Sequence, residues 1–183
     1  MNSCARMGVV GVSALVGLLS PGCYESAYRR TDVGKIEIKT IPAATVLVTK
    51  GENQYFEKPG RMFMRLFRYI EDNQVSMTVP VEAEMEPGVM KFYVGTKDAK
   101  KTLKDTGKVK VVTGEERKVV SIGAMGDYTQ ANVAKAEAKL RSWFGEHPDY
   151  KPVGDAYAVF WDSPFTPGPL RRFEVHIETT QGE

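Results

Sequence analysis

The chain has 183 residues, of which 42% are hydrophobic and 26% are charged, and its formal net charge is +2. This size suits one globular domain with its own core and a short appendage. The near-neutral charge argues against nucleic acid as a partner, because a nucleic-acid binder needs a basic excess to exchange for phosphate counterions. The chain has 2 cysteines, Cys4 and Cys23, both near the N-terminus. The sequence that follows therefore offers no disulfide framework and no cysteine metal site.

The N-terminus has the pattern of a bacterial export signal. Arg6 precedes an apolar run over residues 7–19, which is too short to span a bilayer comfortably but suits the apolar region of a signal peptide. The run ends at Ser20-Pro21-Gly22-Cys23, where a small residue before a cysteine is similar to the lipidation motif of bacterial lipoproteins. Pro21 departs from that motif.

This pattern predicts a lipoprotein-type signal peptide over residues 1–22 and lipidation of Cys23. The lipid would hold the protein on the membrane, at the periplasmic or extracytoplasmic face of the bacterial cell envelope. An uncleaved signal anchor, or a plain secretory signal with a fortuitous cysteine, is the alternative. Residues 23–34 are polar and have no apolar period, so we expect a tether between lipid and domain.

The first regular elements begin at residue 35. Residues 36–38 and 44–49 have the alternation and β-branched content of strands. A helix follows, with Pro59 in its first turn and an apolar stripe at i, i+3, i+4 and i+7 made by Phe63, Leu66, Phe67 and Ile70.

Residues 75–86 alternate without a break, which predicts a strand with one buried face. Val79 lies on the apolar face, whereas Glu82, Glu84 and Glu86 lie on the other, where we expect solvent. Glu82→Ala is accordingly expected to cost little stability. Pro87-Gly88 makes a turn, and residues 90–94 return as a hairpin partner.

The second half repeats the first at a period of roughly 75 residues. Strands are predicted at 109–112 and 118–125, a helix at 131–144, and a closing hairpin at 157–161 and 173–177. The chain is therefore expected to be an α+β domain over residues 35–178, with a tail at 179–183. Its ββαββ unit, used twice, would form an eight-stranded antiparallel sheet or distorted barrel flanked by two helices.

A proline-rich loop joins the strands of the closing hairpin. Pro164, Pro167 and Pro169 fix φ and remove three backbone donors, so the loop is expected to run as a stiff strap across the sheet end. Arg171 and Arg172 follow it directly. They are expected to put two permanent positive charges at the mouth of whatever the two strands enclose.

The residues that carry catalysis in familiar sites are mostly missing. His147 and His176 are the only histidines, so no paired-histidine zinc site is expected, and no glycine loop of the phosphate-binding kind is present. His147 is expected to cap the second helix. His176 alternates with an apolar strand face, so it is expected to point outward as an ordinary residue.

Three patches, in order along the chain, resemble the SOUL heme-binding protein family. They are Arg65-Leu66-Phe67-Arg68-Tyr69-Ile70, the strand over 75–81 with Met-Thr-x-Pro-Val intact, and residues 161–167 followed by 170–175. The resemblance covers about residues 36–177. It implies the duplicated fold, which is similar to that of gyrase-inhibitory small-molecule-binding domains. It also implies binding of heme or another tetrapyrrole in a shallow cleft beside the first helix.

The first helix has side chains that suit such a ligand. Steps of 100° place Arg61, Arg65 and Arg68 on one face, opposite the apolar stripe, with Met64 beside them. The resemblance implies that guanidinium groups pair with tetrapyrrole propionates, together with Arg171 and Arg172, while Met64 covers the ring. The resemblance also implies an axial iron ligand, because some family members are thought to use a histidine near the first strand pair. This chain has no histidine between residues 35 and 50, so any heme would be held without that ligand. A solvated, charged helix face is the alternative.

We therefore expect a non-catalytic, membrane-tethered protein that binds heme, another tetrapyrrole or a similar amphipathic small molecule. One alternative is a structural or interaction lipoprotein of the cell envelope that has the same fold and no ligand. Another is a hydrolase-like relative that acts through Asp162 or Glu174. That alternative would need a perturbed carboxyl group facing a closed pocket.

Overall fold

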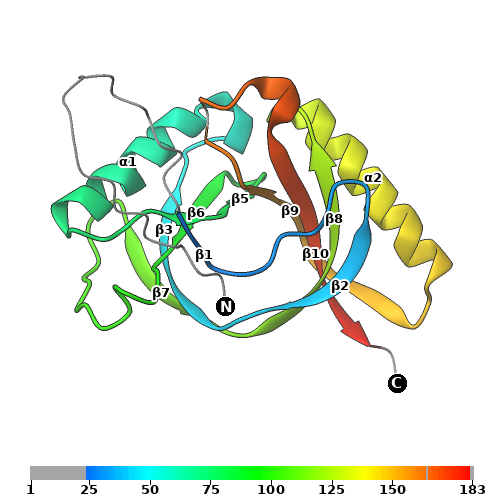
Figure 1. Cartoon of the computed structure of the whole chain (residues 1–183), viewed down its shortest axis with the longest axis horizontal. Coiled ribbons are helices and arrows are strands. Elements are labelled where there is room, and N and C mark those ends of the chain that lie inside the picture. The colour runs from blue at the N-terminus through cyan, green and yellow to red at the C-terminus, as the bar shows by residue number, and fades with distance from the viewer. Residues whose placement is uncertain (1–23, 164, 182–183) are drawn as a thin grey trace, which may run out of the picture.

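The computed structural model describes residues 24–163 and 165–181 (Figure 1). The predicted signal peptide and the predicted lipidation of Cys23 lie outside these residues. Within the described ranges, no helix has both the length and the apolar character needed to cross a membrane.

The elements follow the predicted order twice. The first half contains β2 (Ile36–Ile41), β3 (Ala44–Lys50), α1 (Pro59–Asp72), β4 (Thr78–Val79), β5 (Val81–Glu84) and β6 (Val89–Tyr93). The second contains β7 (Lys110–Gly114), β8 (Arg117–Met125), α2 (Gln130–Glu146), β9 (Tyr150–Phe160) and β10 (Arg172–Gln181). A short β1 (Glu25–Ser26) precedes them, and single 3-10 turns lie at Tyr55–Glu57 and Gly168–Leu170. Pro80 has no backbone N–H, and it divides the strand predicted over 75–86 into β4 and β5.

The sheet order confirms the predicted duplication. Eight strands pair in the order β2-β8-β10-β9-β5-β6-β3-β7, all of them antiparallel. Counted inward from the two edges, the strands of the two halves correspond: β2 with β7, β8 with β3, β10 with β6, and β9 with β5. The first strand of each half pairs with a strand of the other half, β2 with β8 and β7 with β3. The sheet curls into a half-barrel and leaves β2 and β7 as edges (Figure 1).

Both helices pack on the outside of the curl (Figure 1). The α1 helix buries Met62, Leu66, Tyr69 and Ile70, while Phe63 and Phe67 of the predicted stripe are half-buried. In α2, Thr129 caps the first turn by accepting a hydrogen bond from the Asn132 backbone N–H. The buried faces of α1 and α2 belong to the main hydrophobic core, together with the side of the sheet that they cover. Full burial of one leucine there stabilises the fold by about 1.5–3 kcal/mol.

The inside of the curl is covered by the N-terminal segment. Residues 25–33, called the arm below, cross this inner face (Figure 1). The arm begins with β1 paired in parallel to β4, and the Ala27 N–H donates to the Val79 carbonyl at 2.8 Å. It ends where Val33 bridges Gly123. The stretch expected to be a tether therefore lies against the domain from Glu25 onward.

This covering explains two differences from the sequence predictions. Glu82 and His176 do face away from the helices, as the alternation requires. Both are nevertheless buried, with 1% and 0% of their surface exposed, because the arm lies over that face. The expected solvent exposure of these two residues is therefore wrong. Strand period gives the side to which a residue points, but it does not tell what covers that side.

Candidate functional site

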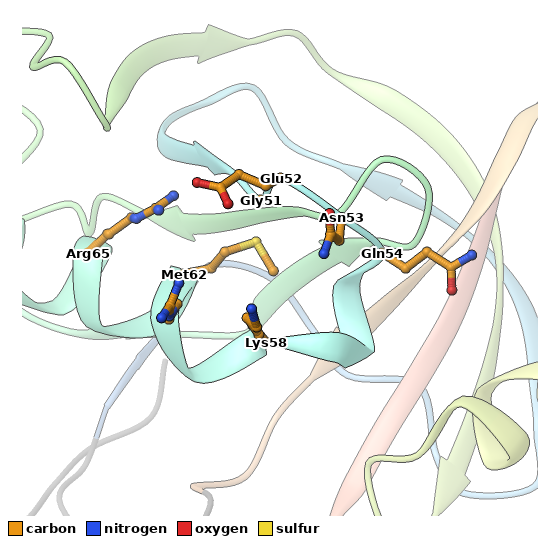
Figure 2. Close-up of a pocket in the computed structure, with 8 residues that line it drawn as sticks. Gly51, Glu52, Asn53, Gln54, Lys58, Met62 and Arg65 are labelled. Atoms are coloured by element: carbon orange, nitrogen blue, oxygen red, sulfur yellow. The ribbon is translucent and has the colours of Figure 1, made fainter.

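The arginines of the first helix line a shallow hollow. Arg61 and Arg65 line it with Lys58, Met62 and residues 51–54. Figure 2 shows Arg65, Met62 and Lys58 on α1 and the turn before it, opposite the loop over residues 51–54. The Arg65 Nη1 atom donates to the Lys50 carbonyl at 3.0 Å. The hollow measures about 30 Å³, roughly the share of one water molecule in the liquid. It is far too small to enclose a tetrapyrrole.

The other two members of the predicted helix cluster lie elsewhere. Met64 is 43% exposed, Arg68 is exposed, and neither lines the hollow. The structure thus brings Arg61 and Arg65 together and leaves Met64 and Arg68 on open helix surface. The assignment of these four residues to a ligand stays a prediction.

The paired arginines of the closing hairpin have separate roles. Arg171 lies over the Tyr128 ring at 5.5 Å, and its Nε donates to the Thr166 carbonyl at 2.8 Å. Arg172 makes a bidentate contact with Asp162, in which Nε donates to Oδ2 at 2.7 Å and Nη2 donates to Oδ1. Burial alone would raise the pKa of the Asp162 carboxyl. The hydrogen bonds and charge of Arg172 outweigh burial and lower that pKa.

A larger hollow opens between the arm and the sheet, and Arg172 lines it. We call it the arginine hollow. Its volume is about 390 Å³, which lies in the range of small-molecule sites. It is lined by residues of the arm, β4 and the closing hairpin: Ser26, Tyr28, Arg29, Arg30, Val79, Trp161 and Arg172.

The arginine hollow holds buried donors without acceptors. Among the described residues, two buried side-chain nitrogens lack a hydrogen-bond partner, Arg30 Nε and Trp161 Nε1. Both residues line this hollow. Buried polar atoms are nearly always paired, and leaving one unpaired costs about 1–3 kcal/mol. Both nitrogens can only donate, so any ligand group that pairs with them must be a hydrogen-bond acceptor.

The composition of the hollow defines what it can hold. Arg29, Arg30 and Arg172 supply positive charge, although Arg29 is paired with Glu37 and Arg172 with Asp162. Tyr28 and Trp161 supply aromatic surface. An amphipathic ligand with an anionic group fits this combination. In the part of the chain that the structure describes, no cluster of three or more His, Cys, Asp or Glu side chains could hold a metal ion.

Sequence reasoning missed most of this hollow. Tyr28, Arg29 and Arg30 belong to the stretch expected to be a tether, and Trp161 was assigned only to a buried strand face. The available signal was the Tyr28-Arg29-Arg30 triplet, where an aromatic residue precedes two arginines just before the first strand. The triplet has no periodicity, so its contact with the sheet could not be inferred.

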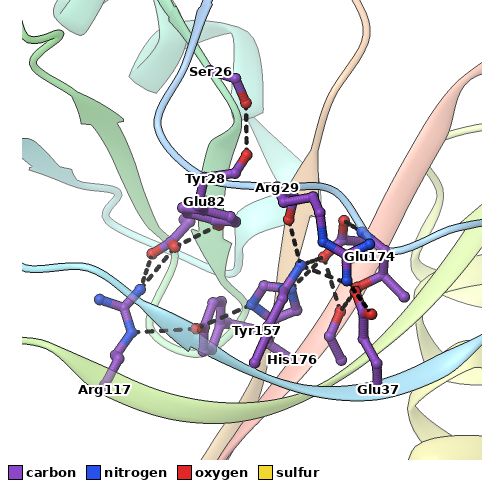
Figure 3. Close-up of polar contacts among 12 residues, drawn as sticks. Ser26, Tyr28, Arg29, Glu37, Glu82, Arg117, Tyr157, Glu174 and His176 are labelled. Atoms are coloured by element: carbon purple, nitrogen blue, oxygen red, sulfur yellow. Dashed lines mark hydrogen bonds and ion pairs between the residues drawn. The ribbon is translucent and has the colours of Figure 1, made fainter. Parts of the chain in front are cut away.

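Beneath the arm lies a buried network of charged and aromatic side chains (Figure 3). Glu82 accepts from Arg117 Nη2 at 2.7 Å through both oxygens, from the Tyr93 hydroxyl at 2.6 Å and from the Tyr28 hydroxyl at 2.9 Å. Glu174 accepts from the Thr31 backbone N–H at 2.7 Å and from Ser121 Oγ at 2.8 Å. Lys39 and His176 also donate to Glu174. Each carboxylate therefore has a cation and several further donors.

The protonation states of the network follow from burial and contacts. Burial alone would raise the pKa of Glu174, but the hydrogen bond from His176 and the charge and hydrogen bond of Lys39 lower that pKa to about 2. Burial lowers the pKa of His176, so its ring is neutral at pH 7. The carboxylate can only accept, so Nε2 of His176 carries the proton and Nδ1 accepts from the Tyr157 hydroxyl at 3.3 Å.

The fold and the arginine hollow together define an α+β half-barrel that has room for a small molecule at the inner face of its sheet. Residues 23–178 match the SOUL heme-binding protein family. The chain belongs to that family. None of the curated proteins matches the chain.

Several solved structures share the fold at low identity. The C-terminal domain of EcmrR is 11% identical, with a TM-score of 0.65, over 80% of this chain and 98% of that one. In the EcmrR–DNA complex, at 12% identity and a TM-score of 0.65, the match covers 80% of this chain but 57% of the EcmrR chain. SAV2435 bound to tetraphenylphosphonium is 13% identical, with a TM-score of 0.51, over 80% of this chain and 94% of that one.

A hydrolase from Listeria innocua is also similar. It is 13% identical, with a TM-score of 0.55, over 82% of this chain and 94% of that one. At such identities these similarities concern the fold alone.

Proposed function

We propose that this protein is a non-catalytic, membrane-tethered binding protein for heme, another tetrapyrrole or a similar amphipathic anion, and that the arginine hollow holds the ligand. The observation that carries the proposal is the pair of buried, unpartnered donors, Arg30 Nε and Trp161 Nε1, in a hollow of about 390 Å³. A carboxylate, such as a tetrapyrrole propionate, offers the acceptors that these donors lack. Membership of the SOUL family supports the ligand class.

The side chains of the hollow suit a flat anionic ligand in other ways. Arg29 is exposed and Arg172 is partly exposed, and both line the hollow, where they can pair with a second carboxylate. The Trp161 ring offers apolar contact to a conjugated ring. Iron coordination is not part of the proposal. His147 bonds the Trp143 carbonyl through Nδ1 at 2.8 Å, and His176 is bonded to Glu174 beneath the arm, so among the described residues no histidine lines the hollow.

Titration of hemin into the full-length chain, purified in a non-ionic detergent, tests the proposal. The Soret absorption is expected to shift and saturate. Trp161→Phe keeps an aromatic ring but removes the indole N–H, so binding is expected to weaken about tenfold, the worth of one hydrogen bond to a charged group. Arg30→Gln is expected to have a similar effect. Arg141→Gln, on the exposed face of α2, is the control and should bind as the wild type does.

The same titration tests the predicted helix cluster. Arg65→Glu would weaken binding several-fold if the ligand lay against α1, because a like charge would face its carboxylate. That result, with Trp161→Phe and Arg30→Gln unchanged, would contradict the arginine hollow and favour Arg61, Met64, Arg65 and Arg68. His147→Ala is expected to leave the spectrum unchanged. A change there would mean that iron ligation, and not the carboxylates, holds the ligand.

Two observations favour binding over hydrolysis. A carboxyl group that acts as a general acid near neutral pH needs a raised pKa. The contacts of Asp162 and Glu174 lower both pKa values instead. Glu174 is also fully buried beneath the arm. These features support a protein that holds a ligand without turnover.

The membrane tether rests on the N-terminal pattern. If Cys23 is lipidated in the bacterial cell envelope, Cys23→Ser should move the protein from the membrane fraction to the aqueous fraction, because the acyl chains supply most of the apolar transfer energy. Fractionation of expressing cells and immunoblotting give the measurement. A serine variant that stays in the membrane with its signal uncleaved would contradict lipidation and favour a signal anchor.

A further inference from the structure

The arm is held to the sheet at its two ends and by contacts between them. At the start the Ala27 N–H bonds the Val79 carbonyl, and at the end Val33 bridges Gly123. Between these points the Thr31 backbone N–H donates to Glu174, the Thr31 hydroxyl bonds Glu37 and Ser121, and the Tyr28 side chain enters a chamber of aromatic and charged groups. The arm thus occupies a groove that the sheet itself forms.

The chamber surrounds the Tyr28 ring on several sides. Tyr93 and Trp161 both meet the ring edge-on, with centroids 5.6 Å away. His176 lies 6.2 Å away at a tilt, and the Lys39 ammonium sits 5.3 Å from the ring centroid. The Tyr28 hydroxyl donates to Glu82 Oε1 at 2.9 Å (Figure 3). We call these five partners, Lys39, Glu82, Tyr93, Trp161 and His176, the aromatic chamber.

The charges of the chamber select a neutral occupant. Arg117 already pairs with Glu82, and Lys39 pairs with Glu174, so the buried carboxylates are balanced. An ammonium above the ring attracts an electron-rich neutral ring and repels a cationic one. Glu82 still needs the donor that Tyr28 provides, because a buried carboxylate oxygen without its donor is destabilised. The preferred occupant is therefore a neutral aromatic ring with one hydrogen-bond donor.

We propose that the aromatic chamber is a second binding site, for a neutral phenol- or indole-type molecule, and that Tyr28 occupies it as an internal ligand. An external ligand of this class enters when the arm leaves. Tyr28, Arg29 and Arg30 also line the arginine hollow, so removal of the arm dismantles part of that hollow. A phenolic ligand and an anionic ligand therefore weaken each other's binding, by equal factors.

Emptying the chamber gives the first test. In the full-length chain in non-ionic detergent, Tyr28→Ala removes the internal ligand, and p-cresol, which is the tyrosine side chain itself, serves as the probe. The unfolding temperature of Tyr28→Ala is expected to rise by several degrees as p-cresol saturates the site. Toluene has no donor and benzylammonium is cationic, so both should raise it much less. The wild type should respond little, because Tyr28 competes from the same chain.

A second variant opens the arm and keeps Tyr28. A Cβ atom on Gly123 would lie 2.3 Å from the Asp32 carbonyl oxygen and 2.7 Å from that of Thr31, so Gly123→Ala pushes the arm away. Trypsin is expected to cleave this variant after Arg29 or Arg30 at least several-fold faster than the wild type, and p-cresol should bind it measurably by calorimetry. Gly107→Ala is the matched control, because an added Cβ there meets nothing within 4 Å.

Two results would overturn the second site. One is that p-cresol binds neither folded variant better than toluene does. The other is that benzylammonium binds better than p-cresol, which would show that the chamber takes a cation. If Tyr28→Ala does not fold, Gly123→Ala decides the matter. The probes carry no carboxylate and no tetrapyrrole, so failure here is distinct from failure of the hemin titration.

Discussion

Glu82→Ala is expected to destabilise the domain by about 3–5 kcal/mol, the usual effect of removing one partner from a buried ion pair. Glu82 is 1% exposed and accepts hydrogen bonds from Arg117, Tyr93 and Tyr28. Without its carboxylate, the partly buried Arg117 guanidinium loses its buried counter-charge and keeps only the more exposed Glu178, and two buried hydroxyls lose their acceptor. Urea unfolding followed by tryptophan fluorescence measures the change.

Glu84→Ala is the matched control on the same strand. The Glu84 side chain is 43% exposed and pairs with Lys91 at 2.6 Å near the surface. Exposed pairs contribute about 0–1 kcal/mol, so this variant should unfold almost as the wild type does. Equal losses in the two variants would contradict the buried network and restore the expectation that both glutamates face solvent.

The second large effect is a loss of stability in acid that depends on Glu174. Its pKa is about 2 in the folded protein, against an ordinary value of 4.5, so below pH 4.5 the unfolded chain binds the proton first. The stabilisation is therefore fully present above pH 4.5 and is lost as pH falls towards 2. A difference of this size corresponds to about 3 kcal/mol.

His176 acts in the same direction at higher pH. Burial lowers its pKa from the ordinary 6.5, so the unfolded chain gains this proton first and stability declines as pH falls below 6.5. Urea unfolding from pH 7 to pH 3 measures both parts. Glu174→Gln has no carboxyl group to titrate, so its stability should fall less steeply below pH 4.5. A Glu174→Gln profile parallel to that of the wild type would contradict the assignment.

The sequence by itself determined the fold and, within an unbroken strand, the direction in which each side chain points. Val79 is the exception: the alternation placed it opposite Glu82, but the strand breaks at Pro80, and Val79 packs on the arm side of the sheet, as Glu82 does. Alternation over residues 173–177 is a property of neighbouring residues on one strand, so it shows that Val175 and His176 face opposite sides. The repeated order of strands and helices likewise determined the duplicated α+β unit. The break at Pro80 was not predicted, although its cause is local, because proline removes a backbone donor wherever it occurs.

Only the tertiary structure decided what lies on the inner face of the curl. Tyr28, Arg29 and Arg30 have no apolar period. Tyr28 contacts residues far away in the sequence, such as Glu82 and Trp161, and all three line a hollow with Trp161 and Arg172. Contacts at that separation depend on how far the sheet curls and where the arm crosses it. No local pattern encodes either of these. Glu82 and His176 therefore read as solvent-facing in the sequence, although in the folded chain the arm covers both.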